Sequence, residues 1–174
     1  MNGKTHKIGG LCAGIIATSM IIEAPYSFEK LFIGGVLIGG SVLGSLMPDI
    51  DLPSSTVGKR VKPISYLINQ IFGHRGITHT PILHIICSIF LLILGGGLTG
   101  FIKLTYLSFV IGLFVGGVSH LVLDAMTVKG IPFLYPFSKK RQRIASFTTG
   151  QDEFIVQVIT VGFTILVMGI CFLF

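Results

Sequence analysis

The amino-acid sequence predicts an all-α protein: a polytopic membrane helix bundle of about five transmembrane helices, forming a single integral membrane domain over residues 1–174. Two features of composition predict this fold class. Charged residues make up only 11% of the chain, whereas soluble domains have about 25%. Mean hydropathy is +0.86, and a soluble fold of this length leaves roughly 30% of its chain surface in water. A lipid bilayer must therefore cover much of the apolar surface.

Five apolar segments have about the length that a helix needs to cross a membrane, roughly 20 residues. They cover approximately residues 7–22, 31–47, 81–102, 104–126 and 154–174. The first two are short, which fits a tilted, flank-extended or re-entrant helix. Three consecutive glycines at 95–97 are a candidate break in the third. The first segment also resembles a signal peptide, but a second apolar segment follows it where a cleavage site and a polar domain would be expected.

The positive charges predict the orientation of these helices. If the N-terminus is cytoplasmic, the connections at about 48–80 and 127–153 are cytoplasmic too. All but two of the thirteen Lys and Arg residues then lie on the cytoplasmic side, the exceptions being Lys30 and Lys103. This bias is the one that the positive-inside rule describes. The sequence therefore predicts a multi-pass membrane protein with its N-terminus in the cytoplasm.

The two predicted cytoplasmic connections have features of the membrane surface. Residues 66–72 fit a short interfacial helix, and the apolar, proline-broken stretch 131–137 fits the headgroup region. The basic run 139–143 predicts attraction to anionic lipid headgroups. Nucleic-acid binding is not expected, because no aromatic interleaving or recognition fold accompanies this run.

The cysteines and glycines of the apolar segments have structural explanations. Cys12, Cys87 and Cys171 lie far apart with no CxxC pattern, which predicts buried thiols and neither a disulfide nor a cysteine-rich zinc module. Small-xxx-small spacing predicts close helix packing at Gly35, Gly39, Gly40, Gly44, Gly112 and Gly116.

Polar side chains with metal-ligand chemistry gather at one predicted membrane face. One lies at the start of the first segment, two follow the second, three precede the third, and two occupy one face of the fourth at i and i+4. Four separate segments thus deliver such side chains to the cytoplasmic side. In chain order they are His6, Asp49, Asp51, His74, Arg75, His79, His120 and Asp124.

The chemistry of this set predicts a divalent metal site. Neutral imidazole and carboxylate are typical zinc ligands and also suit manganese or iron. Four His and three Asp residues exceed a single tetrahedral shell. The set therefore predicts two ions, or one ion with a general base and orienting partners. A metal-activated water attacks phosphoesters, and the planar fork of Arg75 suits a phosphate.

Each residue also has a simpler explanation when it is taken alone. The two Asp residues after the second segment fit a helix cap or an Asx turn, and the His–Asp pair of the fourth fits an intrahelical hydrogen bond. His74 and Arg75 fit headgroup contacts, and His6 fits an ordinary position near a chain end. His84 is off the pattern and fits packing or a partner of a ligand. Their arrival on one side together favours a shared site.

The ordered set of motifs resembles a known family. It consists of His6, then Pro48-Asp49-x-Asp51, then His74-Arg75-Gly76-x-Thr78-His79-Thr80, then Ser119-His120-x-x-x-Asp124-x-x-Thr127, followed by Gly130-Ile131 and Leu134-Tyr135-Pro136-Phe137. This order resembles the YdjM family of bacterial inner-membrane metal-dependent hydrolases, some of them described as LexA-regulated. The resemblance implies a metal-dependent hydrolase-like site at these positions. More loosely, the site is similar to those of zinc-dependent phospholipase C enzymes, which implies a phospholipid or lipid-linked phosphate as substrate.

The sequence therefore predicts a membrane-embedded metal-dependent hydrolase of phosphoesters that acts from the cytoplasmic leaflet. The residues expected to carry catalysis are Asp49, Asp51, Asp124 and Arg75, with one Asp as general base; which Asp activates water stays open. The alternatives are a metal or ion transporter and a lipid-binding scaffold. Transporters bind ions near the bilayer midplane and often contain internal repeats. Placement of the polar set at one rim favours hydrolysis.

Overall fold

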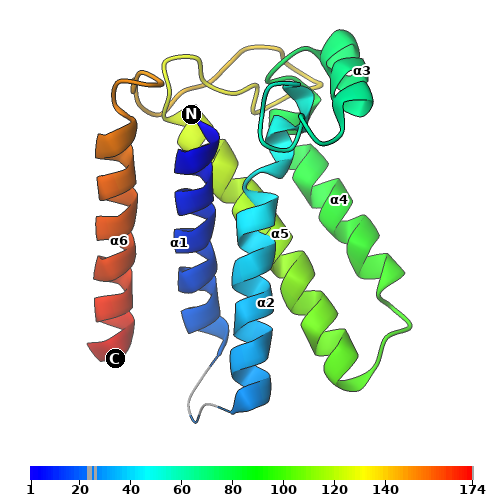
Figure 1. Cartoon of the computed structure of the whole chain (residues 1–174), viewed down its shortest axis with the longest axis vertical. Helices are drawn as coiled ribbons and strands as arrows, with labels where there is room; N and C mark the ends of the chain where they lie inside the picture. The colour runs from blue at the N-terminus through cyan, green and yellow to red at the C-terminus, as the bar shows by residue number, and fades with distance from the viewer. Residues whose placement is uncertain (23–24, 26, 174) are drawn as a thin grey trace.

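The computed structural model describes every residue except 23, 24, 26 and 174. For residues 172 and 173 it describes the backbone alone. Throughout the described residues the ordered elements are helical, with only two isolated β-bridges, which confirms the predicted all-α class. Figure 1 shows their arrangement. In chain order they are α1 (Gly3–Ile21), α2 (Phe28–Gly44), η1 (Met47–Asp51), α3 (Lys62–Phe72), η2 (Ile77–His79), α4 (Pro81–Leu94), α5 (Gly100–Ala125) and α6 (Glu153–Leu173), where η denotes a 3₁₀-helix.

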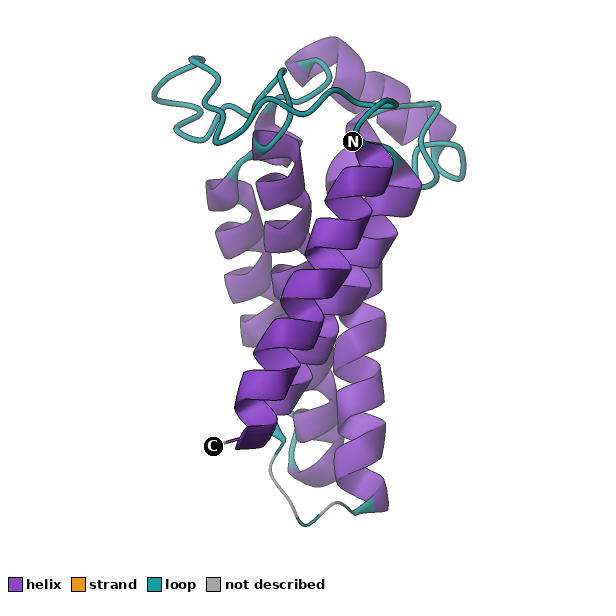
Figure 2. Cartoon of the chain, turned by 90° about the vertical axis from the view of Figure 1, so that its left-hand side faces the viewer, coloured by secondary structure: helices purple, strands orange, loops and turns teal. Residues whose placement is uncertain are grey.

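The five longer helices α1, α2, α4, α5 and α6 lie side by side, and the long connections gather at one end of the bundle (Figures 1 and 2). This end, called the connection end below, also carries the N-terminus and α3, while the C-terminus lies at the opposite end. The connections 45–80 and 126–152 therefore lie on the same side of the bundle. A site shared between them requires this arrangement.

Helix α5 is the centre of the packing: it contacts α2, α1 and α4, while α6 packs against α1. Glycines allow the backbones of α2 and α5 to touch. A Cβ atom on Gly116 would overlap the carbonyl oxygen of Ser41, and one on Gly44 would overlap the backbone of Leu113. Close packing was also predicted for Gly35 and Gly39, and there the prediction is wrong: a Cβ on either glycine would meet no atom within 4 Å.

Three segments are long and apolar enough to cross a membrane by length and composition: Phe28–Asp51, Gly100–Ala125 and Glu153–Cys171. Helix α4 is apolar but has only 14 residues, and α1 is not among the candidate spans. Large apolar side chains lie exposed along α4, α5 and α6. An exposed apolar surface of this kind is suited to contact with lipid, since water would disfavour it.

Several predicted details are corrected by the structure. The helix predicted over 81–102 ends at Leu94 and the next begins at Gly100, which confirms the candidate break at the glycines 95–97; Gly95 lies against the ring of Tyr106, where a side chain would not fit. The interfacial helix predicted over 66–72 is longer and begins at Lys62. Among the cysteines Cys12 is buried, but the predicted burial of Cys87 and Cys171 is wrong, since both lie exposed on helices.

The close contact of α2 and α5 predicts a sharp difference between two glycines. Replacing Gly116→Ala drives a methyl group into the backbone of α2, and overpacking of this kind costs about 1–3 kcal/mol or more. Gly39→Ala adds the same methyl group in open space. We expect Gly116→Ala to lower the thermal unfolding midpoint and the yield of monodisperse protein in detergent, while Gly39→Ala leaves both unchanged. Equal behaviour of the two variants would contradict the packing.

Candidate metal centre

His6 lies near the start of α1, which is fixed from two directions. The side chain of Asn2 caps the helix by accepting from the backbone N–H groups of Lys4 and Thr5. The carboxylate of Glu153, buried at the start of α6, accepts from the backbone N–H of Asn2 (2.8 Å) and from the hydroxyl of Thr5. Helix α6 thus holds the turn that carries His6.

The short helix η1 presents two different faces. Its residues Asp49 and Asp51 point into the bundle among His side chains, whereas Pro48 and Ile50 line an apolar groove. The Asn69 side chain, from α3, donates to the backbone carbonyl of Asp51 at 2.7 Å. This hydrogen bond connects α3 to η1. The His/Asp cluster lies on one side of η1 and the apolar groove on the other.

A tight turn places His74 and Arg75 between α3 and η2. Gly73 has a φ of 71° and Arg75 a φ of 60°, a left-handed conformation that costs a non-glycine residue about 1–2 kcal/mol. The backbone N–H of Arg75 donates to Asp51 Oδ2 at 3.0 Å. This bond and the contacts of the Arg75 side chain offset the strain and bring the turn onto η1.

His79 and His120 meet at the centre of the cluster, both fully buried. His120 Nδ1 lies 2.7 Å from the backbone carbonyl of Ser45, which only accepts, so this nitrogen carries the proton and Nε2 carries a lone pair. His79 Nδ1 lies 3.2 Å from Asp51 Oδ2, which likewise assigns the lone pair to Nε2. The two Nε2 atoms are 3.2 Å apart. With both rings neutral, these lone pairs face each other and repel, so a proton or a metal ion is required between them.

Two carboxylate oxygens complete the group. Asp49 Oδ1 lies 3.7 Å from His79 Nε2 and 3.8 Å from His120 Nε2. Asp124 Oδ2 lies 3.5 and 3.7 Å from the same two atoms. Ligands about 2.0–2.1 Å from a tetrahedral zinc ion lie about 3.3–3.4 Å from one another. His79, His120 and Asp124 are therefore spaced as three corners of a slightly expanded zinc site, and their chemistry fits the ion, while Asp49 belongs to neighbouring groups that share His120 or His79.

The environment of His79 also favours positive charge. Burial lowers the pKa of His79, but contacts with the carboxylates of Asp49, Asp51 and Asp124 raise it, and the net result lies above the ordinary value. The carboxylates thus attract either a proton or a cation to this position. Because four ligand atoms converge on it, a divalent cation satisfies more of them than one proton does.

Asp51 and His74 form an outer layer around His79. Both oxygens of Asp51 are occupied: Oδ1 contacts His74 Nδ1 at 3.0 Å, and Oδ2 accepts from Arg75 N and from the Thr78 hydroxyl at 2.6 Å. A carboxylate on the far nitrogen of a metal-binding imidazole fixes its tautomer and orientation. His74 is the most accessible of the four histidines in the predicted set, with 34% of its side chain exposed.

Arg75 lies inside the site with most of its donors engaged. Its Nη2 pairs with Asp124 Oδ2 at 2.9 Å, and its Nη1 donates to the Thr127 hydroxyl and the Gly130 carbonyl at 2.9 and 3.2 Å. The buried Nε has no hydrogen-bond partner among the described residues. Arg75 therefore ties the turn before η2 to the end of α5, and its unpaired Nε–H is left for a ligand. Asp124 also contacts the amino group of Met1 through Oδ1.

His6 is the clearest sign of further ligand capacity. Its ring stacks on that of His120, with centroids 3.6 Å apart and planes 11° apart. It is fully buried, yet neither of its ring nitrogens has a hydrogen-bond partner among the described residues. An unpaired buried polar atom costs about 1–3 kcal/mol. Its Nε2 lies 3.4 Å from Asp124 Oδ1, and a cation bound with Asp49 and His120 would satisfy it.

The structure thus brings the whole predicted set to the connection end. Three groups of ligand atoms have the proximity that a metal needs: His6, Asp49 and His120; His79, His120 and Asp124; and Asp49, Asp51 and His79. His74 and Arg75 border them. Their roles as ligands stay predictions.

Sequence reasoning assigned no role to several residues that hold the set in place. The Thr78 hydroxyl donates to Asp51, and the Thr127 hydroxyl donates to the carbonyl of Asp124 while accepting from Arg75. Both threonines occur inside the motifs, which is a signal of a role. Glu153 and the Ser45 carbonyl leave no such signal, because their contacts arise only from the helix packing.

Fold and site together define a multi-pass membrane protein with a buried His/Asp cluster suited to a divalent cation. The model of the YdjM inner membrane protein family matches residues 1–174, so the chain belongs to the YdjM family. It is a protein of the bacterial cytoplasmic membrane, and the predicted family and location are confirmed.

Relatives agree with this assignment. The chain is 32% identical over 168 residues to uncharacterized protein YvsG of Bacillus subtilis, covering 95% of this chain and 91% of the relative. It is 35% identical over 102 residues to inner membrane protein YdjM of Escherichia coli and to that of Shigella flexneri. In both cases the match covers 58% of this chain and about half, 49%, of the relative. No solved structure matches the chain.

The cluster predicts a clear result for metal analysis. Wild-type protein purified in detergent should contain about one or two equivalents of zinc, manganese or iron by elemental analysis. His79→Ala removes the nitrogen that three of the five central contacts share and should reduce the content at least tenfold, since even partners of a ligand contribute roughly 10–100-fold to metal affinity. The matched control is His84→Ala, because His84 donates to the Thr80 carbonyl outside the cluster. Equal metal content in the three proteins would contradict the site.

Proposed function

We propose that this protein is a membrane-embedded metal-dependent hydrolase that cleaves phosphoesters of a phospholipid or lipid-linked phosphate. The single observation that carries the proposal is the convergence of His79 Nε2, His120 Nε2 and Asp124 Oδ2 at spacings of 3.2–3.7 Å, with Asp49 Oδ1 3.7–3.8 Å from the same two nitrogens. A divalent cation held there, zinc first and manganese or iron as alternatives, supplies Lewis-acid stabilisation of phosphate charge and activates water.

The protein's own residues have distinct parts in the proposal. Asp49 is the most accessible of the central ligands, with 12% of its side chain exposed against 0–1% for His79, His120 and Asp124. Substrate and water reach the cluster there, and Asp49 is the candidate general base for the attacking water. Asp51 orients His79 through Nδ1. The unpaired Nε of Arg75 is the donor available to a phosphate oxygen.

Placement at the connection end supports hydrolysis over transport. A carrier binds its ion near the midplane, where two halves of the bundle alternate in access. Here the ligands come from helix ends and from two short 3₁₀ elements. The proposal includes about five membrane crossings with the connection end in the cytoplasm, so the site faces the inner leaflet.

This orientation is tested by labelling introduced cysteines in a background without native ones. Ser54→Cys and Thr149→Cys lie in exposed parts of the two long connections, and Gly97→Cys lies in an exposed turn at the other end. An impermeant maleimide should label only position 97 in intact cells and all three after permeabilisation. Opposite responses of positions 54 and 149 would contradict a shared site.

The proposed reaction is tested by phosphate release from a panel of phospholipids in mixed micelles. Release should require added zinc or manganese and stop with a chelator. Asp49→Asn should lower kcat by roughly 10²–10⁴-fold, the usual loss of a general base. Asp152→Asn is the matched control, since Asp152 only accepts from the backbone of Thr148 in a loop. Zinc flux into proteoliposomes without any phosphate release would contradict the proposal and favour a transporter.

A further inference from the structure

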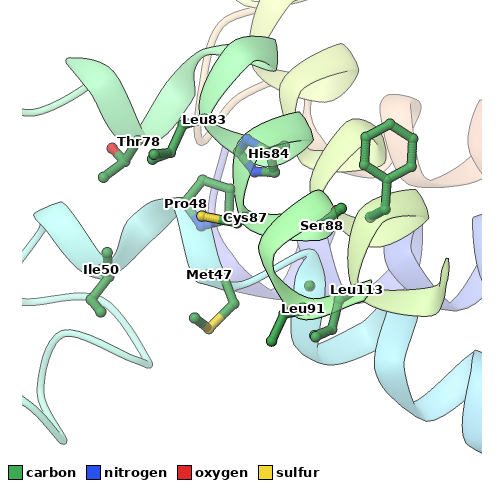
Figure 3. A pocket seen from close by; sticks show the side chains of 12 residues that line it. Met47, Pro48, Ile50, Thr78, Leu83, His84, Cys87, Ser88, Leu91 and Leu113 are labelled. Carbon is green, nitrogen blue, oxygen red and sulfur yellow. The ribbon is translucent and has the colours of Figure 1, made fainter. Parts of the chain in front are cut away.

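An apolar groove adjoins the His/Asp cluster. Figure 3 shows the side chains that line this groove. It has a volume of about 190 Å³ and runs between η1, α4 and α5, and no Lys, Arg, Asp or Glu lines it. Among the residues that line it are Pro48, Ile50, Thr78, Cys87 and Leu113. Its surface is nearly all hydrocarbon, so it is suited to an apolar occupant.

The groove and the cluster share one wall. In η1, Pro48 and Ile50 line the groove, and Asp49 between them contacts His79 and His120. Thr78 lines the groove as well, and its hydroxyl donates to Asp51. A molecule seated in the groove therefore has its polar end at the rim where Asp49 is most accessible.

The outer side of the groove faces the lipid. Helix α4 has no buried residue, and its outward side chains Ile82, Ile85, Ile86 and Ile89 are 37–55% exposed. In a membrane the molecules in contact with such a surface are lipid chains. An alkyl chain can move sideways into the groove without passing through water.

We propose that this groove binds one hydrocarbon chain of a lipid phosphoester, with the phosphate at Asp49, and that it makes the enzyme selective for long-chain substrates. The inference rests on the proposed function for the position of the phosphate. The charge-free lining excludes a headgroup from the groove, and continuity with the cluster along η1 fixes the direction in which the lipid lies. The chain passes from bilayer hydrocarbon to groove hydrocarbon, so the hydrophobic effect contributes little to this binding. Selectivity comes instead from the groove holding the chain so that the phosphate lies at the cluster.

Cys87 offers a way to fill the groove without disturbing the core, because its side chain is exposed. Cys87→Trp places an indole in the groove. Ile86→Trp is the matched control, since Ile86 is 55% exposed on the same helix and does not line the groove. We expect Cys87→Trp to lower kcat/KM on dioleoyl phosphatidic acid about tenfold or more. Hydrolysis of glycerol 3-phosphate, which has the phosphate but no chain, should stay unchanged, as should the metal content.

A second readout does not depend on turnover. Phosphatidic acid with a diazirine in one acyl chain, mixed at low fraction into phosphatidylcholine vesicles that contain the protein, should crosslink to groove residues such as Leu91 and Leu113. Excess dioleoyl phosphatidic acid should compete, and Cys87→Trp should abolish this crosslinking while Ile86→Trp retains it. Crosslinks spread evenly over the outer face of α4, or confined to the separate groove beside Phe133, would overturn the proposal.

The outcomes separate this inference from the proposed function. Groove crosslinking without phosphate release from any substrate supports the lipid groove and contradicts the hydrolase. Suppose phosphate is released, but Cys87→Trp does not alter the rate, or lowers it equally for dioleoyl phosphatidic acid and glycerol 3-phosphate. The hydrolase then stands, and the groove proposal is overturned.

Discussion

The contact on which the site depends is between two imidazole nitrogens whose lone pairs face each other when both rings are neutral. His79 Nε2 and His120 Nε2 lie 3.2 Å apart in a fully buried place. Their far nitrogens are committed to the Asp51 carboxylate and the Ser45 carbonyl. Such a contact is repulsive unless positive charge joins it, and the carboxylates of Asp49 and Asp124 beside it make the same demand. One or two divalent cations resolve these conflicts, since Asp124 forms a ligand group with both imidazoles and Asp49 lies in groups that contain one of them.

The packing of the helices brings these two histidines together. Gly44 and Gly116 bring the backbones of α2 and α5 together, so that the end of α2 supplies the Ser45 carbonyl to His120 one turn beyond Gly116. The same approach puts η1, which follows α2, against the end of α5. Because α6 holds the start of α1 through Glu153, His6 reaches its stacking position on His120. The positions of the His and Asp side chains at the connection end therefore follow from the contacts between the long helices.

Much of this could be predicted from the sequence. Basic residues and apolar runs predict that the connections share a side, and spacing within His120-x-x-x-Asp124 puts both side chains on one face. The rest depends on tertiary contacts. Both oxygens of Asp51 have protein partners, and Arg75 spends most of its donors on Asp124, Thr127 and Gly130. The three glycines at 95–97 indicate the break after Leu94, whereas the contact of Tyr106 with Gly95 depends on the packing.

X-ray absorption at the zinc edge of the zinc-loaded protein tests the shared cation most directly. The account predicts first-shell nitrogen and oxygen scatterers at about 2.0–2.1 Å, the multiple-scattering pattern of two or more imidazoles, and no sulfur at about 2.3 Å. A sulfur shell, or zinc surrounded only by water oxygens, would contradict the claim that His and Asp side chains of the cluster hold the cation.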